Sequence, residues 1–141
     1  MKHSETLLLI FSLIISLASC YTKPPVVYSI PEQDSIRTPF KISINKLATD
    51  FKFWQGQTIE TEGILHIGFE EFTISPNKDF FSKYSDAFWL NTNQKLNIDY
   101  DYLQKASGRR IRIKGVVDTS RKGHLSSYLA TIDHIYFLEV Q

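Results

Sequence analysis

The sequence predicts an all-β domain with short helices, built as a small barrel of five strands. Segments of alternating apolar and polar residues, each with a glycine inside, occur twice, at residues 56–65 and 108–117. Alternation with a period of two is typical of a half-buried strand. A glycine within such a strand marks a bulge or a sharp bend, which a small barrel requires.

The other elements follow from apolar spacing and from the residues that interrupt it. Residues 43–55 place apolar side chains at helical spacing, with Ser43 as the N-cap of an added N-terminal helix. Strands are expected at residues 69–75, 86–92 and 128–140, and a short helix at residues 98–107 stops at Gly108. After the first helix the order is β-β-β-α-β-β, with one helix between strands 3 and 4. This is the order of an OB-fold barrel, so the predicted domain is OB-like.

The two copies of the repeat are the first and fourth strands of this barrel, which pair antiparallel in the OB arrangement. Their polar faces then place acidic side chains beside basic ones: Glu60 and Glu62 against Arg110, Arg112 and Lys114. Opposite charges across a strand pair contribute roughly 0.2–1 kcal/mol each and help to set the register.

The N-terminus has the pattern of an export signal. The apolar run at residues 7–17 follows Lys2 and is shorter than the about 20 residues that span a bilayer. The alternative is a buried core helix. The sequence Leu17-Ala18-Ser19-Cys20 resembles the bacterial lipobox, which implies cleavage before Cys20 and acylation of its thiol. This implies a lipid-anchored domain outside the cytoplasm, and Tyr21 favours the outer membrane where the cell has one.

The predicted organisation has three parts. Residues 1–19 are a lipoprotein signal peptide, residues 20–40 an acylated cysteine with a proline-rich tether, and residues 41–141 the barrel domain. Proline removes a backbone donor, so the tether is expected to be semi-extended. The alternative is an ordered arm packed on the domain, since Val26, Val27, Tyr28 and Ile30 are apolar.

Charge restricts the choice of partner. The formal net charge is +1, which offers no whole-molecule attraction to nucleic acid. Basic residues cluster around the fourth strand, close to aromatic residues as in an OB nucleic-acid groove. Export from the cytoplasm makes nucleic acid an unlikely partner. The cluster is either a solvated, salt-paired face or a binding face for a protein or a polyanionic envelope component.

The last third of the chain carries a family resemblance. The segment GRRIRIKGVVD at residues 108–118, the turn Gly123-His124-Leu125 and the strand around Ile132 and Ile135 resemble small, poorly characterised bacterial exported proteins with an OB-like domain. The resemblance implies an OB-like fold and an envelope setting. It implies no established activity and no catalytic residues.

No motif for catalysis or for a cofactor is present. The mature histidines are not at metal-ligand spacing, and the chain has no G-x-S-x-G motif or phosphate-binding glycine loop. We therefore expect a non-catalytic binding protein without metal or cofactor. The alternatives are a metal-dependent or hydrolytic enzyme centred on His124 and an immunity- or inhibitor-type lipoprotein. The candidate binding residues are Arg110, Arg112, Lys114, His124, Tyr128, Phe80, Phe81 and Tyr84.

Overall fold

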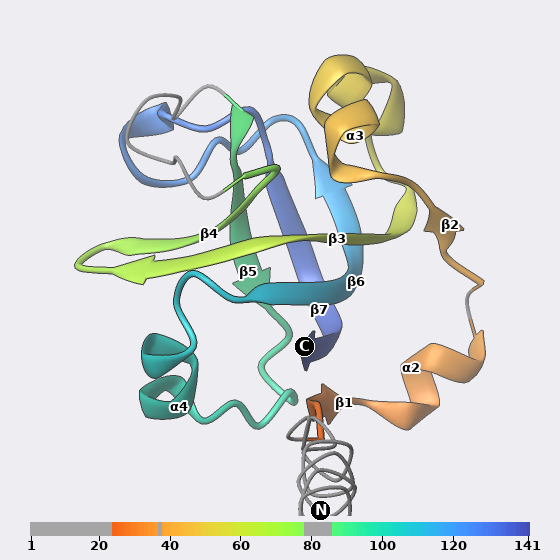
Figure 1. Cartoon of the computed structure of the whole chain (residues 1–141). Helices are drawn as coiled ribbons and strands as arrows, with labels where there is room; N and C mark the ends of the chain where they lie inside the picture. The colour runs from red at the N-terminus through yellow and green to blue at the C-terminus, as the bar shows by residue number, and fades with distance from the viewer. Residues whose placement is uncertain (1–23, 37, 78–85) are drawn as a thin grey trace, which may run out of the picture.

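The computed structural model describes residues 24–36, 38–77 and 86–141 (Figure 1). The strands are β1 (Val26–Ser29), β2 (Phe40–Lys41), β3 (Thr58–Gly68), β4 (Glu71–Ser75), β5 (Phe88–Thr92), β6 (Arg110–Asp118) and β7 (Thr131–Val140). The helices are α2 (Pro31–Ile36), α3 (Ile44–Asp50) and α4 (Tyr100–Lys105), with short 3₁₀ turns η1 (Phe51–Trp54) and η4 (His124–Ser126).

Five of these strands close a mixed barrel in the order β3-β4-β5-β7-β6 and back to β3. All neighbours are antiparallel except β5 and β7, which are parallel. Helix α4 lies between the third and fourth barrel strands in the chain. The predicted OB-like barrel is therefore confirmed, including the antiparallel pairing of the two repeat copies, β3 and β6.

The predicted helices are present but shorter. Ser43 caps α3 as expected, since its Oγ accepts from the backbone N–H of Lys46 at 3.4 Å. The regular helix ends at Asp50, and the chain continues through Trp54 as a 3₁₀ turn. Asp99 caps α4, accepting from the N–H of Tyr102 at 3.0 Å. A side-chain acceptor at this position satisfies an otherwise unpaired N–H at the helix start.

The glycine inside each repeat copy lies where another strand approaches closely. A Cβ on Gly63 would stand 2.7 Å from Ile74 Cγ1 and from the backbone oxygen of Ser75. A Cβ on Gly115 would stand 2.9 Å from the backbone oxygen of Asp133. Beside Gly115 the register of the β6–β7 pair shifts between Lys114 and Val116. Both glycines therefore provide close strand contacts, as the repeat predicted for a small barrel.

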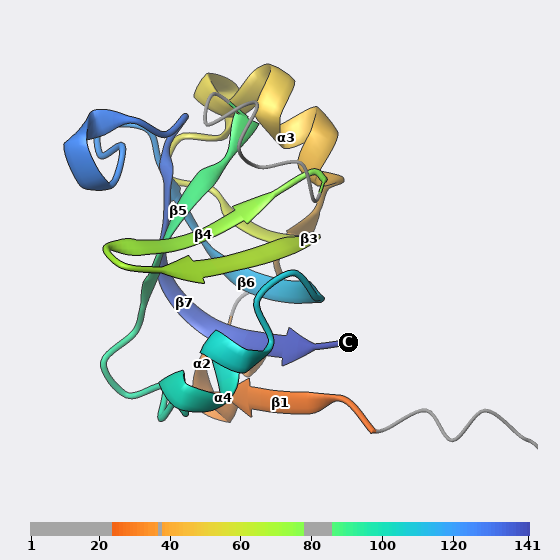
Figure 2. The same cartoon turned by 60° about the vertical axis from the view of Figure 1, so that its left-hand side comes forward.

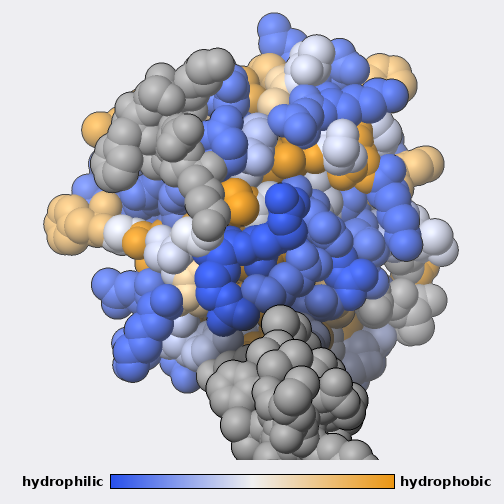
Figure 3. All heavy atoms as spheres, in the orientation of Figure 1, coloured by the Kyte–Doolittle hydropathy of each residue, from blue (hydrophilic) through white to orange (hydrophobic). Residues whose placement is uncertain are grey.

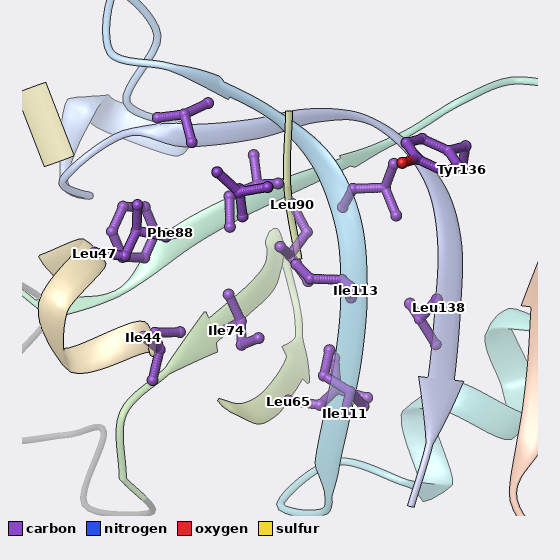
Figure 4. Packing of buried hydrophobic residues seen from close by; sticks show 14 of the residues in the cluster. Ile44, Leu47, Leu65, Ile74, Phe88, Leu90, Ile111, Ile113, Tyr136 and Leu138 are labelled. Carbon is purple, nitrogen blue, oxygen red and sulfur yellow. The ribbon is translucent and has the colours of Figure 1, made fainter. Parts of the chain in front are cut away.

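The barrel interior is filled by side chains from every barrel strand, and α3 adds Ile44 and Leu47 (Figure 4). Phe88 on β5 is the largest fully buried side chain. Each fully buried aliphatic or aromatic side chain contributes roughly 1.5–3 kcal/mol relative to exposure. Burial of these apolar side chains therefore holds the barrel strands and α3 together.

The proline-rich segment contains structure before the barrel begins. Strand β1 pairs antiparallel with β7, with Val26 opposite Val140 and Ser29 opposite Phe137. Ile30 is buried in the core, and its N–H donates to the carbonyl of Tyr136 at 2.9 Å. From Val26 to Ile30 the chain is therefore the ordered arm that was the alternative to a tether. The predicted signal peptide and Cys20 lie outside the described residues.

Candidate functional site

The basic side chains of β6 face acidic partners within the fold. Glu60 lies opposite Lys114 and Glu62 opposite Arg112 in the β3–β6 register. The Glu60 carboxylate is 3.8 Å from Lys114 Nζ and 3.9 Å from Arg112 Nη1. Arg112 also donates to Glu139 on β7, and this hydrogen bond raises the pKa of the Arg112 guanidinium. Phe137 lies under both cations, its ring centre 4.7 Å from Lys114 Nζ and 5.3 Å from the Arg112 guanidinium carbon.

Two of the three predicted basic residues are thus engaged in contacts between strands. Arg110 differs, because it is exposed and forms no ion pair with any other described residue. The Glu139 partner was not expected, because β7 carries it far along the chain. The arrangement is that of the salt-paired face, with Arg110 as its one open cation among the described residues.

Two loops of the barrel meet at one edge of it. The β3–β4 turn carries Phe69 and Glu70, and the loop between β6 and β7 carries η4. His124 Nε2 lies 3.2 Å from Glu70 Oε2, which connects the two loops. We call Phe69, Glu70, His124 and Leu125 the loop tips.

The loop tips carry the two large apolar side chains with the highest exposed fractions among the described residues. Phe69 is 94% exposed and Leu125 is 83% exposed. Figure 3 shows hydrophobic atoms at the left edge of the molecule, where the β3–β4 hairpin and η4 project in Figure 1. Glu70, Leu125 and Ser126 have φ values of 54°, 52° and 56°. Left-handed backbone at such residues is costly, and it concentrates at functional sites.

A polar hollow of about 450 Å³ lies beside the loop tips, between β5 and the β6–β7 loop. Trp89, Asn91, Arg121 and Lys122 line it. Two of these lining residues bind the buried Asp133, which accepts from Asn91 Nδ2 at 2.6 Å and from Arg121. The hollow therefore has two cations in its lining, of which Arg121 is ion-paired with Asp118 and Asp133.

Asp118 fixes the start of the same loop. Hydrogen bonds from Ser120 and from Arg121, with Nε at 2.7 Å from Asp118 Oδ2, lower the pKa of the Asp118 carboxyl to about 2. Because its folded-state pKa lies below 3.8, the carboxylate stabilises the fold above about pH 4. This stabilisation is lost as the pH falls toward 2.

Asp118→Asn is expected to lower the free energy of unfolding at pH 7 by about 1–2 kcal/mol. This is less than the pKa shift alone implies, since the side chain is 20% exposed. Denaturant unfolding of both proteins should show the difference falling by more than half at about pH 2.5. Asp101→Asn, on the exposed face of α4, is the control. An equal loss at both pH values would contradict the role of the charge.

Tyr128 is buried rather than available for binding. Its ring packs 5.4 Å from the Trp89 ring, and both belong to a small cluster with Ala87. The Gly123 backbone also lies against Trp89. A Cβ on Gly123 would meet three Trp89 atoms at 2.7 Å, and its φ is +65°. Gly123 therefore lets the loop close over Trp89.

Gly123→Ala is expected to displace the loop from Trp89 and to lower the free energy of unfolding by about 1–2 kcal/mol. The added Cβ would clash with Trp89, and alanine is strained at a positive φ. In a Trp54→Phe background, Trp89 fluorescence should shift to longer wavelength as water reaches the ring. Gly56→Ala is the matched control, since Gly56 has φ +74° but no atom within 4 Å of its Cβ position. Equal effects of the two substitutions would show that the Trp89 contact contributes nothing.

The histidines are dispersed. His66 Nε2 lies 2.8 Å from Ser75 Oγ, and burial lowers the pKa of the imidazole. His134 is exposed, with φ 49° in β7, and His124 is near Glu70. Within the described ranges, no three His, Cys, Asp or Glu side chains come together to hold a metal ion.

Not all predicted residues can be placed. Phe80, Phe81 and Tyr84 lie outside the described residues, as does Cys20. Of the described candidates, His124 alone lies at the loop tips, and it had been considered for catalysis. Sequence reasoning missed Phe69 and Leu125 as candidates, although a Gly-Phe-Glu-Glu turn between two strands indicates an apolar residue at a hairpin tip.

No family model matches the chain, and neither the curated proteins nor the solved structures yielded a significant match. The fold is therefore assigned from the strand pairing of this structure alone. Among the residues that the structure describes, no helix is long and apolar enough to cross a membrane.

Proposed function

We propose that this chain is a non-catalytic lipoprotein of the cell envelope whose barrel binds another protein through the loop tips. The observation that carries the choice of surface is the exposure of Phe69 and Leu125 on two adjoining loops. OB-fold barrels use the loops at these positions, after the first strand and between the last two, to bind ligands. Exposed apolar side chains in strained backbone are a cost that a binding function explains.

Charge favours a protein partner over a polyanion. Lys114 and Arg112 are engaged by Glu60 and Glu139, so the basic strand offers little free positive charge. The apolar tips need hydrophobic pockets in the partner, and Lys122 at the rim of the hollow adds a polar contact. Apolar anchors surrounded by polar groups are typical of protein interfaces.

The orientation fits a domain held at its N-terminal side. Both views place β1 at the lower end of the barrel, while the β3–β4 hairpin and η4 project at the left and upper left (Figures 1 and 2). An anchor at Cys20 connects to β1 through a short segment. The loop tips then point away from the membrane that holds the anchor.

A crosslinking pull-down from native envelopes tests the proposed surface. The full chain should capture a defined protein, and Phe69→Ser/Leu125→Ser should lose it. Ile36→Ser is the matched control, because Ile36 is also an exposed apolar side chain but belongs to α2. Arg110→Glu should retain the partner. Loss with Arg110→Glu and retention with the double variant would move binding to the basic strand and refute the proposal.

The anchor has its own test. The wild-type chain is expected to incorporate labelled palmitate and to sediment with membranes, since acyl chains on one residue contribute about 0.8 kcal/mol per buried CH₂. Cys20→Ser should do neither, while the barrel remains folded. Palmitate incorporated by Cys20→Ser would rule out Cys20 as the anchor.

A further inference from the structure

A second apolar surface lies on the barrel end covered by α3 and η1. Phe40 on β2 and Phe53 on η1 both pack edge-on against Trp54, with ring centroids 5.9 Å and 5.7 Å away. We call Phe40, Phe53 and Trp54 the aromatic surface. It uses different elements from the loop tips, so it can be tested independently of the proposed function.

The aromatic surface is open to solvent. Phe53 is 80% exposed and Phe40 is 56% exposed. The Trp54 indole N–H is buried and has no hydrogen-bond partner among the described residues. Phe51, Phe53 and Trp54 also border an open hollow of about 680 Å³. Exposed aromatic side chains next to a hollow are typical of interaction sites.

Two lysines border the hollow beside the aromatic surface. Lys46 and Lys52 line the hollow, where Asp50 is the one acidic lining residue. In Figure 3, hydrophobic atoms stand among hydrophilic ones at the upper right, where α3 lies in Figure 1. The surface therefore combines an apolar centre with a cationic rim.

We propose that the aromatic surface binds an acidic polypeptide segment that carries an apolar anchor residue. The anchor fills the hollow against Phe53 and Trp54, and carboxylates of the segment face Lys46 and Lys52. Opposite charges at the rim of an interface speed association and select the partner. The segment belongs to another protein and not to the anchoring membrane, because α3 and η1 lie at the opposite end of the barrel from β1 (Figures 1 and 2).

A random-sequence peptide library, selected on the immobilised full chain in detergent, tests the proposal. Selected peptides should be enriched in Asp and Glu around an aromatic or aliphatic residue. Their affinity should be measured by Trp54 fluorescence in a Trp89→Phe background. Phe53→Ala and Lys46→Glu/Lys52→Glu should each weaken binding by about tenfold or more, and added salt should weaken it further.

Matched variants separate this surface from the others. Ile36→Ala and Lys95→Glu change an exposed apolar residue and an exposed lysine elsewhere, and they should leave peptide affinity unchanged. The proposal is overturned if selection yields no acidic peptides, or if Phe53→Ala binds them as well as the wild type. Sedimentation of the Cys20→Ser chain with phosphatidylglycerol vesicles through Phe53, or self-association lost in Phe53→Ala, would assign the surface to a membrane or to a second copy and would also overturn it.

Discussion

Phe88→Ala is expected to lower the free energy of unfolding by about 3–5 kcal/mol, the largest effect of a single substitution in this barrel. Phe88 has no exposed surface and is the largest fully buried side chain of the described residues. Its removal loses the transfer free energy of the ring and leaves a cavity that the neighbouring strands cannot fill. Natural single domains are stable by only about 5–15 kcal/mol, so the variant should be close to unfolding.

Denaturant unfolding followed by circular dichroism measures this loss. Phe69→Ala serves as the control, because the same change at a 94% exposed position should alter stability by less than about 0.5 kcal/mol. The control also shows that loop-tip variants are folded. A loss below about 1 kcal/mol for Phe88→Ala would mean that the barrel interior is packed differently.

Gly63→Val should destabilise the fold by about 3 kcal/mol through overpacking. Its new Cβ would lie 2.7 Å from Ser75 O and Ile74 Cγ1, and 2.9 Å from Ile44 Cδ1. The Ser75 oxygen is backbone, so relief requires movement of β4. Gly63 does not have a positive φ, and the expected effect is therefore steric.

Thermal unfolding of Gly63→Val beside Gly68→Ala checks this. At Gly68 the nearest atom to an added Cβ is Glu71 Oε2 at 3.2 Å, the end of a flexible side chain that can move away. We expect Gly68→Ala to stay within about 1 kcal/mol of the wild type. Similar losses of stability for both variants would show that a clash with β4 is not the cause of the effect at Gly63.

The elements that sequence predicted best are those with a strong local pattern. In the repeated strands β3 and β6, apolar and polar residues alternate along most of the strand. The opposite charges on their polar faces also indicated that the two strands pair, and Glu60 does lie opposite Lys114. Ser43 marked the start of α3 because a side-chain cap is a local interaction. These features need no knowledge of distant residues.

The rest depends on partners far along the chain. Strand β1 has four residues behind two prolines and is ordered by its pairing with β7 at the other end of the sequence. Glu139 neutralises Arg112 by the same long-range register. The loop tips require two turns to meet in space, so no single window of sequence contains the site.

Strand β7 pairs with β1, β5 and β6, all of which precede it in the sequence. The barrel cannot close until β7 is in place, because among the described strands it alone pairs with both β5 and β6. Such non-local pairing is slow, with closure expected in about milliseconds to seconds.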